Sequence, residues 1–262
     1  MIVQSFVKKK REGVPISMVT CYDSWSAALV AETDIDCVLV GDSLAMVVYG
    51  HDTTLPVDMD TMAAHTAAVR RGMPKKFLIG DMPFLSYRKG LEVAMSNVGK
   101  LMSAGANAVK LEGANGNLEL VRHIVESGVP VMGHLGLTPQ SVHQLGGFKV
   151  QAGDDDEAAA LMQHALALEQ AGCFALVLEA VPAPVAAKVT RALEIPTIGI
   201  GAGPDVGGQV LVLQDLLGVN TAFRPKFVRT WLDGSNLIRE AVQAYHEDVT
   251  SGNFPNSRES YQ

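Results

Sequence analysis

Residues 77–112 read FLIGDMPFLSYRKGLEVAMSNVGKLMSAGANAVKLE. Two short apolar runs in this stretch, Phe77 to Asp81 and Asn107 to Glu112, have the length and composition of buried β-strands. Between them, Leu91 to Ser103 repeats its apolar residues with the spacing of an α-helix. A strand, a helix and a second strand in this order predict a βαβ unit with parallel strands.

The same alternation recurs along the chain. The candidate strands are Ile16 to Thr20, Asp36 to Gly41, Phe77 to Asp81, Asn107 to Glu112, Val129 to Gly133, Phe174 to Glu179, Pro196 to Ile200 and a weaker pattern near Val219 to Ala222. The candidate helices are Ser24 to Glu32, Asp58 to Arg71, Leu91 to Ser103, Asn117 to Ser127, Asp155 to Gln170, Pro184 to Leu193 and Lys226 to Val249. This pattern predicts an α/β fold, a (β/α)8 TIM barrel. A doubly wound open sheet is the alternative, because alternation alone does not distinguish the two folds.

One catalytic domain is expected over residues 1–262, because no linker-like stretch interrupts the pattern. Residues 251–262 are polar and aperiodic, which predicts a tail that extends from the barrel. Two connections that follow strands, Asp42 to Pro56 and Gly133 to Gly153, are longer than ordinary strand–helix loops. In a barrel such loops build the face that carries the active site, so we expect the chemistry there.

Composition and charge narrow the range of partners. A net charge of −7 and a pI of about 5.5 disfavour nucleic acid and anionic membranes as partners. The apolar runs are too short to cross a bilayer, and no apolar segment follows the basic run Lys8 to Arg11, so we expect a cytoplasmic protein that acts on a small molecule. Cys21, Cys37 and Cys173 form no CxxC pair and are odd in number, which predicts free thiols.

Four of the strand-like runs end in an acid, namely Asp42, Asp81, Glu112 and Glu179. Because the carboxyl ends of parallel strands meet at one mouth of a barrel, these side chains are expected to converge, and their mutual repulsion calls for a cation. Oxygen ligands without a cluster of Cys or His favour a hard cation such as Mg²⁺. Any one of these acids could instead cap the helix that follows its strand.

Lys110 lies two residues before Glu112, so the two side chains share one face of the strand, which is the interior if Val109 and Leu111 face the helices. A lysine inside a barrel needs an anion, which makes Lys110 a candidate to bind a substrate carboxylate; a salt bridge to a strand-end acid is the alternative, and the two roles are compatible. Ser43 has no GxSxG context, so we expect its hydroxyl to bind a substrate oxygen rather than to act as a nucleophile.

Two further features have simpler explanations. His134 follows the fifth strand and could be a metal ligand or an acid, but a lone histidine more often orders a loop by hydrogen bonding, and we favour that role. The run from Gly199 to Gly203, GIGAG, is similar to a phosphate-cradling turn. Its glycines can equally permit a close approach of the backbone to a ligand or a helix.

Six blocks of sequence are more specific. They are VGDSL (40–44), GHDTTLPV (50–57), HTAAVRRG (65–72), GHLGLTPQSV (133–142), GGFKVQ (146–151) and IGIGAG (198–203). Together they resemble the ketopantoate hydroxymethyltransferase family, and the resemblance extends from about Val14 to Pro255. Several blocks are too long for chance agreement, and the resemblance covers nearly the whole chain.

The resemblance implies a (β/α)8 barrel that uses Mg²⁺ to transfer a hydroxymethyl group from 5,10-methylenetetrahydrofolate to 3-methyl-2-oxobutanoate through an enolate. The product would be 2-dehydropantoate, a precursor of pantothenate and coenzyme A. A homo-oligomer, typically a decamer, is also implied. By motif, the metal-associated acids are Asp42, Asp81 and Glu112, the substrate contacts are Asp42, Ser43, Asp81 and Lys110, and the catalytic proton acceptor is Glu179.

The sequence departs from the family pattern at Ala45, Ala152 and Gln214, where glycine, glycine and histidine are usual, and at Gly113-Ala114, where two glycines are frequent. None of these positions is a candidate site residue, so the departures bear on folate affinity, loop conformation or rate. Two other functions are considered, a carbon–carbon lyase or mutase of the phosphonopyruvate and isocitrate lyase barrel group and a non-catalytic paralogue. The sequence lacks the Lys-Cys-Gly-His block of those lyases, and it retains every acid and Lys110.

Overall fold

The computed structural model describes residues 1–221 and 225–261, which form two compact units, Met1–Val212 and Leu213–Gln262. The first unit contains a closed barrel of eight strands in sequence order, and every neighbouring pair is parallel. The strands are β1 (Ile16–Thr20), β2 (Cys37–Val40), β3 (Phe77–Asp81), β4 (Ala108–Glu112), β5 (Val131–Gly136), β6 (Ala175–Glu179), β7 (Thr197–Ile200) and β8 (Gly208–Leu211). The closed barrel confirms the predicted TIM fold and excludes the open sheet.

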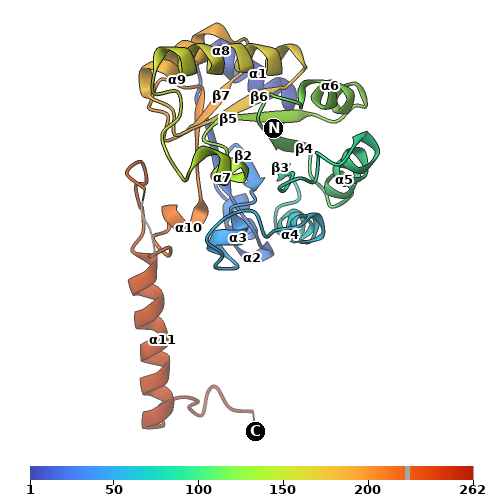
Figure 1. Cartoon of the computed structure of the whole chain (residues 1–262). Coiled ribbons are helices and arrows are strands. Elements are labelled where there is room, and N and C mark those ends of the chain that lie inside the picture. Colours follow the sequence, from blue (N-terminus) through green and yellow to red (C-terminus); the bar gives the residue numbers. More distant parts are fainter. Residues whose placement is uncertain (222–224, 262) are drawn as a thin grey trace. The chain divides into compact units, whose positions relative to one another are not determined.

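Helices follow most of the strands and lie outside them (Figure 1). In the first unit they are α1 (Val3–Glu12), α2 (Ser24–Ala31), α3 (Leu44–Val47), α4 (Met59–Gly72), α5 (Leu91–Ser103), α6 (Leu118–Glu126), the 3₁₀ turn η1 (Pro139–Ser141), α7 (Val142–Leu145), α8 (Asp155–Gln170) and α9 (Ala183–Ala192). Three start at an aspartate, Asp23, Asp58 or Asp154, whose carboxylate accepts a hydrogen bond from a backbone N–H of the first turn. These caps explain why the predicted starts of α2, α4 and α8 agree with the structure to within one residue.

Alternate residues of the strands fill the barrel interior. On β3, Phe77 and Ile79 belong to the apolar core, and Asp81 follows at the same spacing. The intervening Gly80 faces outward, because a Cβ placed on it would lie 3.2 Å from the Leu101 side chain of α5. The interior therefore changes from apolar to ionisable along the strands, towards their carboxyl ends.

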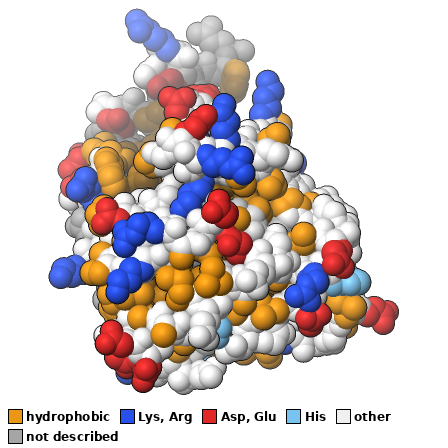
Figure 2. All heavy atoms as spheres, turned by 90° about the horizontal axis from the view of Figure 1, so that it is seen from above, with side chains coloured by type: hydrophobic (Ala, Val, Ile, Leu, Met, Phe, Trp, Pro, Cys, Tyr) orange, Lys and Arg blue, Asp and Glu red, His pale blue; other side chains and the backbone are white. Residues whose placement is uncertain are grey.

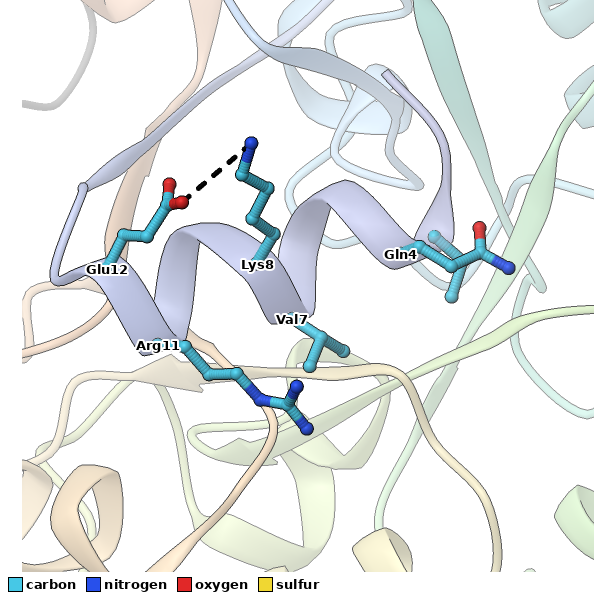
Figure 3. A pocket seen from close by; sticks show the side chains of 6 residues that line it. Gln4, Val7, Lys8, Arg11 and Glu12 are labelled. Carbon is cyan, nitrogen blue, oxygen red and sulfur yellow. Dashed lines mark ion pairs between the residues drawn. The ribbon is translucent and has the colours of Figure 1, made fainter.

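The amino-terminal end of the barrel is covered by α1, a helix that the sequence patterns did not predict. Phe6 is fully buried there, and its ring packs edge-on against Phe77 and Phe174 with centroid distances of 5.1 and 5.0 Å. The outer face of α1 borders a shallow depression of about 390 Å³, where Lys8 and Glu12 form an exposed ion pair (Figure 3). This depression lies at the opposite end of the barrel from the buried ionisable groups.

The eighth strand was wrongly placed by the sequence patterns. It is Gly208–Leu211 rather than a segment near Val219 to Ala222; residues 219–221 form no strand, and Ala222 lies outside the described residues. The short run GQVL does not look like a buried strand, because Gln209 is exposed and Gly208 has no side chain. Yet Gly208 pairs with β1 and β7, and a Cβ on it would lie 2.3 Å from Ile16 O. Only glycine fits where the barrel closes.

The second unit contains α10 (Leu213–Leu216) and α11 (Gly234–Ser251). The helix predicted from Lys226 begins instead at Gly234 and ends at Ser251, and the capping residue Gly252 has a left-handed conformation. The predictions of a single domain and of a tail that extends from the barrel stay predictions. Among the described residues, no helix combines the length and the apolar character needed to cross a membrane. On the face shown in Figure 2, acidic and basic side chains are intermixed with apolar ones.

Candidate active site

Strand register brings the ionisable side chains of neighbouring strands together. Asp81 of β3 pairs with Lys110 of β4, and Glu112 of β4 pairs with His134 of β5. Glu179, the last residue of β6, pairs with Gly136 of β5. Because these positions all lie at the carboxyl ends of parallel strands, one end of the barrel collects acids and cations in adjacent positions.

Lys110 is the centre of this cluster. Its Nζ lies 2.8 Å from Asp81 Oδ2, 3.9 Å from Glu112 Oε1 and 3.3 Å from His134 Nδ1, and all four side chains are almost fully buried. Burial by itself lowers the pKa of Lys110, but the charges of Asp81, Glu112 and Asp42 outweigh it and raise that pKa above its ordinary value. Lys110 is therefore a permanent positive charge inside the barrel.

His134 joins the lysine cluster to the strand-end acid of β6. Its Nδ1 lies 3.4 Å from Glu112 Oε1, and its Nε2 lies 3.2 Å from Glu179 Oε2. Burial and the charge of Lys110 lower the pKa of His134, but the two carboxylates outweigh them and raise it to about 9. Burial raises the pKa of Glu112, whereas His134 and Lys110 bring it below its ordinary value. The pair is thus an imidazolium and a carboxylate at neutral pH.

Asp42 lies beside Asp81 at the end of β2. The backbone N–H of Asp42 donates to Asp81 Oδ2 at 3.2 Å, and Asp42 Oδ2 accepts a hydrogen bond from Gln140 Nε2 at 2.9 Å. Burial, followed by the charges of Asp81 and Glu112, raises the pKa of Asp42 well above its ordinary value. Burial also raises the pKa of Asp81, against the charge of Lys110. Both shifts indicate that negative charge at this position is insufficiently compensated.

Ser43 is partly exposed beside Asp42. Its hydroxyl lies 2.8 Å from the hydroxyl of Tyr22, which follows β1. A Cβ placed on Gly41 would lie 2.9 Å from Ser43 Oγ, so glycine at this position leaves room for the serine side chain. The end of β2 therefore presents a hydroxyl next to a carboxyl group.

The donor set fits a hard cation. Four carboxyl groups share the network with two cationic groups, Lys110 and His134, so acids exceed cations by two. Asp81 Oδ1 is buried without a hydrogen-bond partner, which leaves a carboxylate oxygen for an ion. Within the described ranges, no three His, Cys, Asp or Glu side chains already form a complete metal site. Mg²⁺ needs only one or two protein carboxylates, with water and substrate oxygens as its other ligands.

All six residues singled out from the sequence lie in this one region: Asp42, Ser43, Asp81, Lys110, Glu112 and Glu179. Sequence reasoning placed His134 after the end of β5, whereas the strand continues to Gly136 and His134 contacts Glu112 and Glu179. It also gave no role to Tyr22, Tyr87 or Gln140. The side chain of Gln140 is nearly fully buried and bonds to several site segments; only its place in a glycine-rich loop after β5 could have suggested this.

The glycine run from Gly199 to Gly203 packs against α9, and the phosphate-binding turn that was considered for it stays a prediction. It leads from β7 into β8 rather than directly into a helix, and it lies against Ala183, the first residue of α9. Gly203 has a φ of +80°, and a Cβ on it would lie 2.3 Å from Ala183 Cβ of α9. These glycines permit close packing of the backbone on a helix.

A closed parallel barrel with its buried acids, lysine and histidine at the carboxyl ends of the strands defines an enzyme of the TIM-barrel class. Residues 1–257 match the family described as ketopantoate hydroxymethyltransferase. The 3-methyl-2-oxobutanoate hydroxymethyltransferase of Bdellovibrio bacteriovorus is 61% identical over 259 residues, 99% of this chain and 98% of the relative. That of Coxiella burnetii (strain CbuG_Q212) is 54% identical over 256 residues, 97% of this chain and 96% of the relative. The chain belongs to the ketopantoate hydroxymethyltransferase family.

Solved structures agree on the fold. A 2,3-dimethylmalate lyase of the PEP mutase/isocitrate lyase superfamily has a TM-score of 0.62 at 15% identity and covers 94% of this chain and 88% of its own. The phosphoenolpyruvate phosphomutase of Streptomyces platensis subsp. rosaceus has a TM-score of 0.64 at 11% identity and covers 96% and 88%. At these identities the likeness shows the barrel fold alone, so it does not favour the lyase or mutase alternative.

Proposed function

We propose that this chain transfers a hydroxymethyl group from 5,10-methylenetetrahydrofolate to 3-methyl-2-oxobutanoate and so forms 2-dehydropantoate. The observation that carries the proposal is the buried network at the barrel mouth, where Asp81, Lys110, Glu112, His134 and Glu179 lie in consecutive contact. The two full-length relatives, at 61% and 54% identity, carry the name of this activity. The network supplies a positive charge for the carboxylate of a small oxo acid, and acids that can hold a cation or accept a proton.

Asp42 and Asp81 are the residues that would hold Mg²⁺, and Glu112 is the third acid close to it. A free oxygen on Asp81 and the raised pKa values of both aspartates support this assignment. When bound, Mg²⁺ supplies a Lewis acid for the carboxylate and keto oxygens of the substrate and so favours negative charge on the keto oxygen.

Lys110 and Ser43 are proposed to bind the oxo acid. The ammonium group of Lys110 provides a positive charge for the substrate carboxylate in a region from which water is largely excluded. The hydroxyl of Ser43, beside that of Tyr22, can donate a hydrogen bond to a substrate oxygen. Together these groups fix one end of a short substrate and leave its other end towards β6.

Glu179 is proposed to remove the proton from C3 of the oxo acid. Its carboxyl group is the most accessible of the four acids, with 18% of its side chain exposed, while His134 lies 3.2 Å from one of its oxygens. A carboxylate that contacts a histidine through one oxygen and is partly exposed can accept a proton from a substrate carbon. His134 is assigned to position Glu179, because its Nε2 lies 3.2 Å from Glu179 Oε2.

The carbon–carbon bond then forms between C3 and the one-carbon unit of the folate. The proton on C3 goes to Glu179, and the electron pair left on C3 forms the new bond to the methylene carbon. Both C–N bonds of that carbon break, and water supplies the hydroxyl oxygen. The two nitrogens of the released tetrahydrofolate take up one proton of that water and the proton first accepted by Glu179. The long loops after β2 and β5 border the mouth at which the folate enters. The charged residues of the network are assigned to binding and deprotonating the oxo acid.

Product formation tests the proposal directly. Purified protein with Mg²⁺, 3-methyl-2-oxobutanoate and 5,10-methylenetetrahydrofolate should yield 2-dehydropantoate, which mass spectrometry identifies. Lys100→Met, which removes an exposed lysine outside the barrel, serves as a control variant and should form the product as the wild type does. No product from folded wild-type protein would refute the proposed reaction.

The finer properties implied by the resemblance are part of the same proposal. They are a cytoplasmic location and a decameric assembly. Mass photometry of the purified protein at nanomolar concentration measures the assembly, and a decamer of the 27.9 kDa chain would give a mass of about ten times that value. A monomer would contradict this part of the proposal and leave the reaction unaffected.

A further inference from the structure

Gln140 makes hydrogen bonds to four residues in three separate segments of the site. Its Nε2 donates to Asp42 Oδ2 and to Met82 O, both at 2.9 Å, and its Oε1 accepts from the hydroxyl of Tyr87 at 2.8 Å. Its backbone N–H donates to Glu112 Oε2 at 3.0 Å. One residue of the loop after β5 therefore bonds to the segments that follow β2 and β3 and to the end of β4.

The orientation of the Gln140 amide is fixed by its partners. Both Nε2 protons face oxygen acceptors, a carboxyl oxygen of Asp42 and Met82 O, and the carbonyl oxygen of Met82 cannot donate. Reversing the amide would place its oxygen against both of them and leave the Tyr87 proton without its acceptor. Tyr87 is buried, and burial followed by the charges of Glu112 and Asp81 raises the pKa of its hydroxyl, which keeps it a donor.

We propose that Gln140, oriented by Tyr87, is a positioning residue that holds Asp42 and Glu112 at a fixed separation and leaves the other oxygen of Asp42 for a divalent cation. This inference rests on the proposed function, because it assigns Gln140 to the cation site of that reaction. Partners of ligating carboxylates commonly control metal affinity in this way.

A structural role alone predicts a different result. If Gln140 only tied loops together, its removal would lower stability but leave the affinity of the folded protein for a cation unchanged. If it positions Asp42, then its side chain, and not its backbone bond to Glu112, sets the affinity. Gln140→Met keeps the length of the side chain and removes both side-chain donors, while the backbone bond remains available.

The experiment measures the dissociation constant of Mn²⁺, without substrates, by electron paramagnetic resonance of the free ion. Mn²⁺ prefers the same oxygen ligands as Mg²⁺. Gln140→Met should raise the dissociation constant by about 10- to 100-fold. Tyr87→Phe, which removes only the group that orients the amide, should raise it by about fivefold. Thr66→Val is the matched control, because Thr66 is also buried and its hydroxyl donates a hydrogen bond to Met62 O within α4.

Asp42→Asn separates the two levels of the argument. If Asp42→Asn weakens Mn²⁺ binding and folded Gln140→Met does not, the positioning role is wrong and the proposed function stands. If Asp42→Asn binds Mn²⁺ as tightly as the wild type, the cation site of the proposed function is itself wrong. If Gln140→Met does not fold, Tyr87→Phe decides, and an unchanged dissociation constant in that variant overturns the inference.

Discussion

Lys110 Nζ lies 2.8 Å from Asp81 Oδ2 across the β3–β4 register, with 4% and 1% of the two side chains exposed. Burying such a pair is unfavourable for each ion, and hydrophobic residues of similar size often give equal or greater stability. A buried ion pair in this position is therefore better explained by function than by stability. In the proposed function the lysine also binds the carboxylate of a substrate, beside the acids of the barrel.

Lys110→Met should lower both stability and substrate affinity. Removing one partner of a buried pair typically costs about 3–5 kcal/mol, because Asp81 is left without its counter-ion. Chemical denaturation measures the loss, and the KM for the oxo acid should rise. Lys100→Met is the control, since it breaks an ion pair to Asp60 that is largely exposed and is expected to change stability by less than about 1 kcal/mol. Equal effects of the two substitutions would contradict the role of Lys110.

Gly136→Ala should displace the end of β6. Gly136 has a φ of +88°, and a Cβ on it would lie 2.3 Å from Glu179 O. The left-handed conformation alone costs alanine about 1–2 kcal/mol, and the collision adds to that cost. Gly128→Ala is the matched control, with a φ of +89° and no atom within 4 Å of the added Cβ. We expect turnover to fall only in Gly136→Ala; equal turnover of the two folded variants would show that the collision does not reach Glu179.

Phe6→Ala should destabilise the barrel without changing its chemistry. Its ring is fully buried against Phe77 and Phe174 at the end of the barrel opposite the site. Truncating a buried phenylalanine typically costs about 3–5 kcal/mol. Leu29→Ala on α2, where the side chain is exposed, serves as the control. Denaturant unfolding gives the free energies, and a loss below about 1 kcal/mol in Phe6→Ala would show that α1 is not part of the core.

Asp36 should stabilise the folded protein at neutral pH, and this contribution should be lost at acidic pH. Burial raises its pKa, but hydrogen bonds from Lys9 and Ser17 and the charge of Lys9 bring the pKa below its ordinary value. A carboxyl group whose pKa is lower in the folded state stabilises above its unfolded pKa of about 4, and this contribution is lost as the pH falls below that value. The stability difference between wild type and Asp36→Asn, about 1 kcal/mol at pH 7, should therefore shrink below pH 4.

Denaturant unfolding from pH 7 to pH 3 checks the prediction for Asp36. Asp34→Asn, which alters an exposed carboxyl group two residues earlier, controls for the change in net charge. A difference between wild type and Asp36→Asn that stays constant over this range would contradict the assigned hydrogen bonds.

Seven of the eight strands were predicted from sequence, because each is a continuous apolar run bounded by polar residues. The period of two along β4 was enough to predict that Lys110 and Glu112 share one face of the strand, which is the interior face in the structure. Their neighbours could not be predicted, because register between strands depends on the closed barrel and leaves no local signal. The contact between Lys110 and Asp81 is a consequence of that register.

The features that the sequence patterns missed or misplaced are α1, β8 and the role of Gln140, and each omission has a physical cause. α1 has a strongly polar sequence in which only Phe6 is buried, so its apolar pattern is too sparse to indicate its contact with the core. β8 contains Gly208 and an exposed Gln209, which conceal a strand that completes the barrel. Gln140 lies in a loop, and loop conformation is set by distant contacts, here with Asp42 and Tyr87.

Exchange of the C3 proton of 3-methyl-2-oxobutanoate with D₂O, followed by NMR without folate, tests the central claim that these acids act around a hard cation and a bound oxo acid. Wild-type protein with Mg²⁺ should exchange this proton. Metal-stripped wild type and Glu179→Gln with Mg²⁺ should exchange it at least about 100-fold more slowly, since a positioned base contributes at least that factor. Exchange at the wild-type rate in either sample would contradict the account.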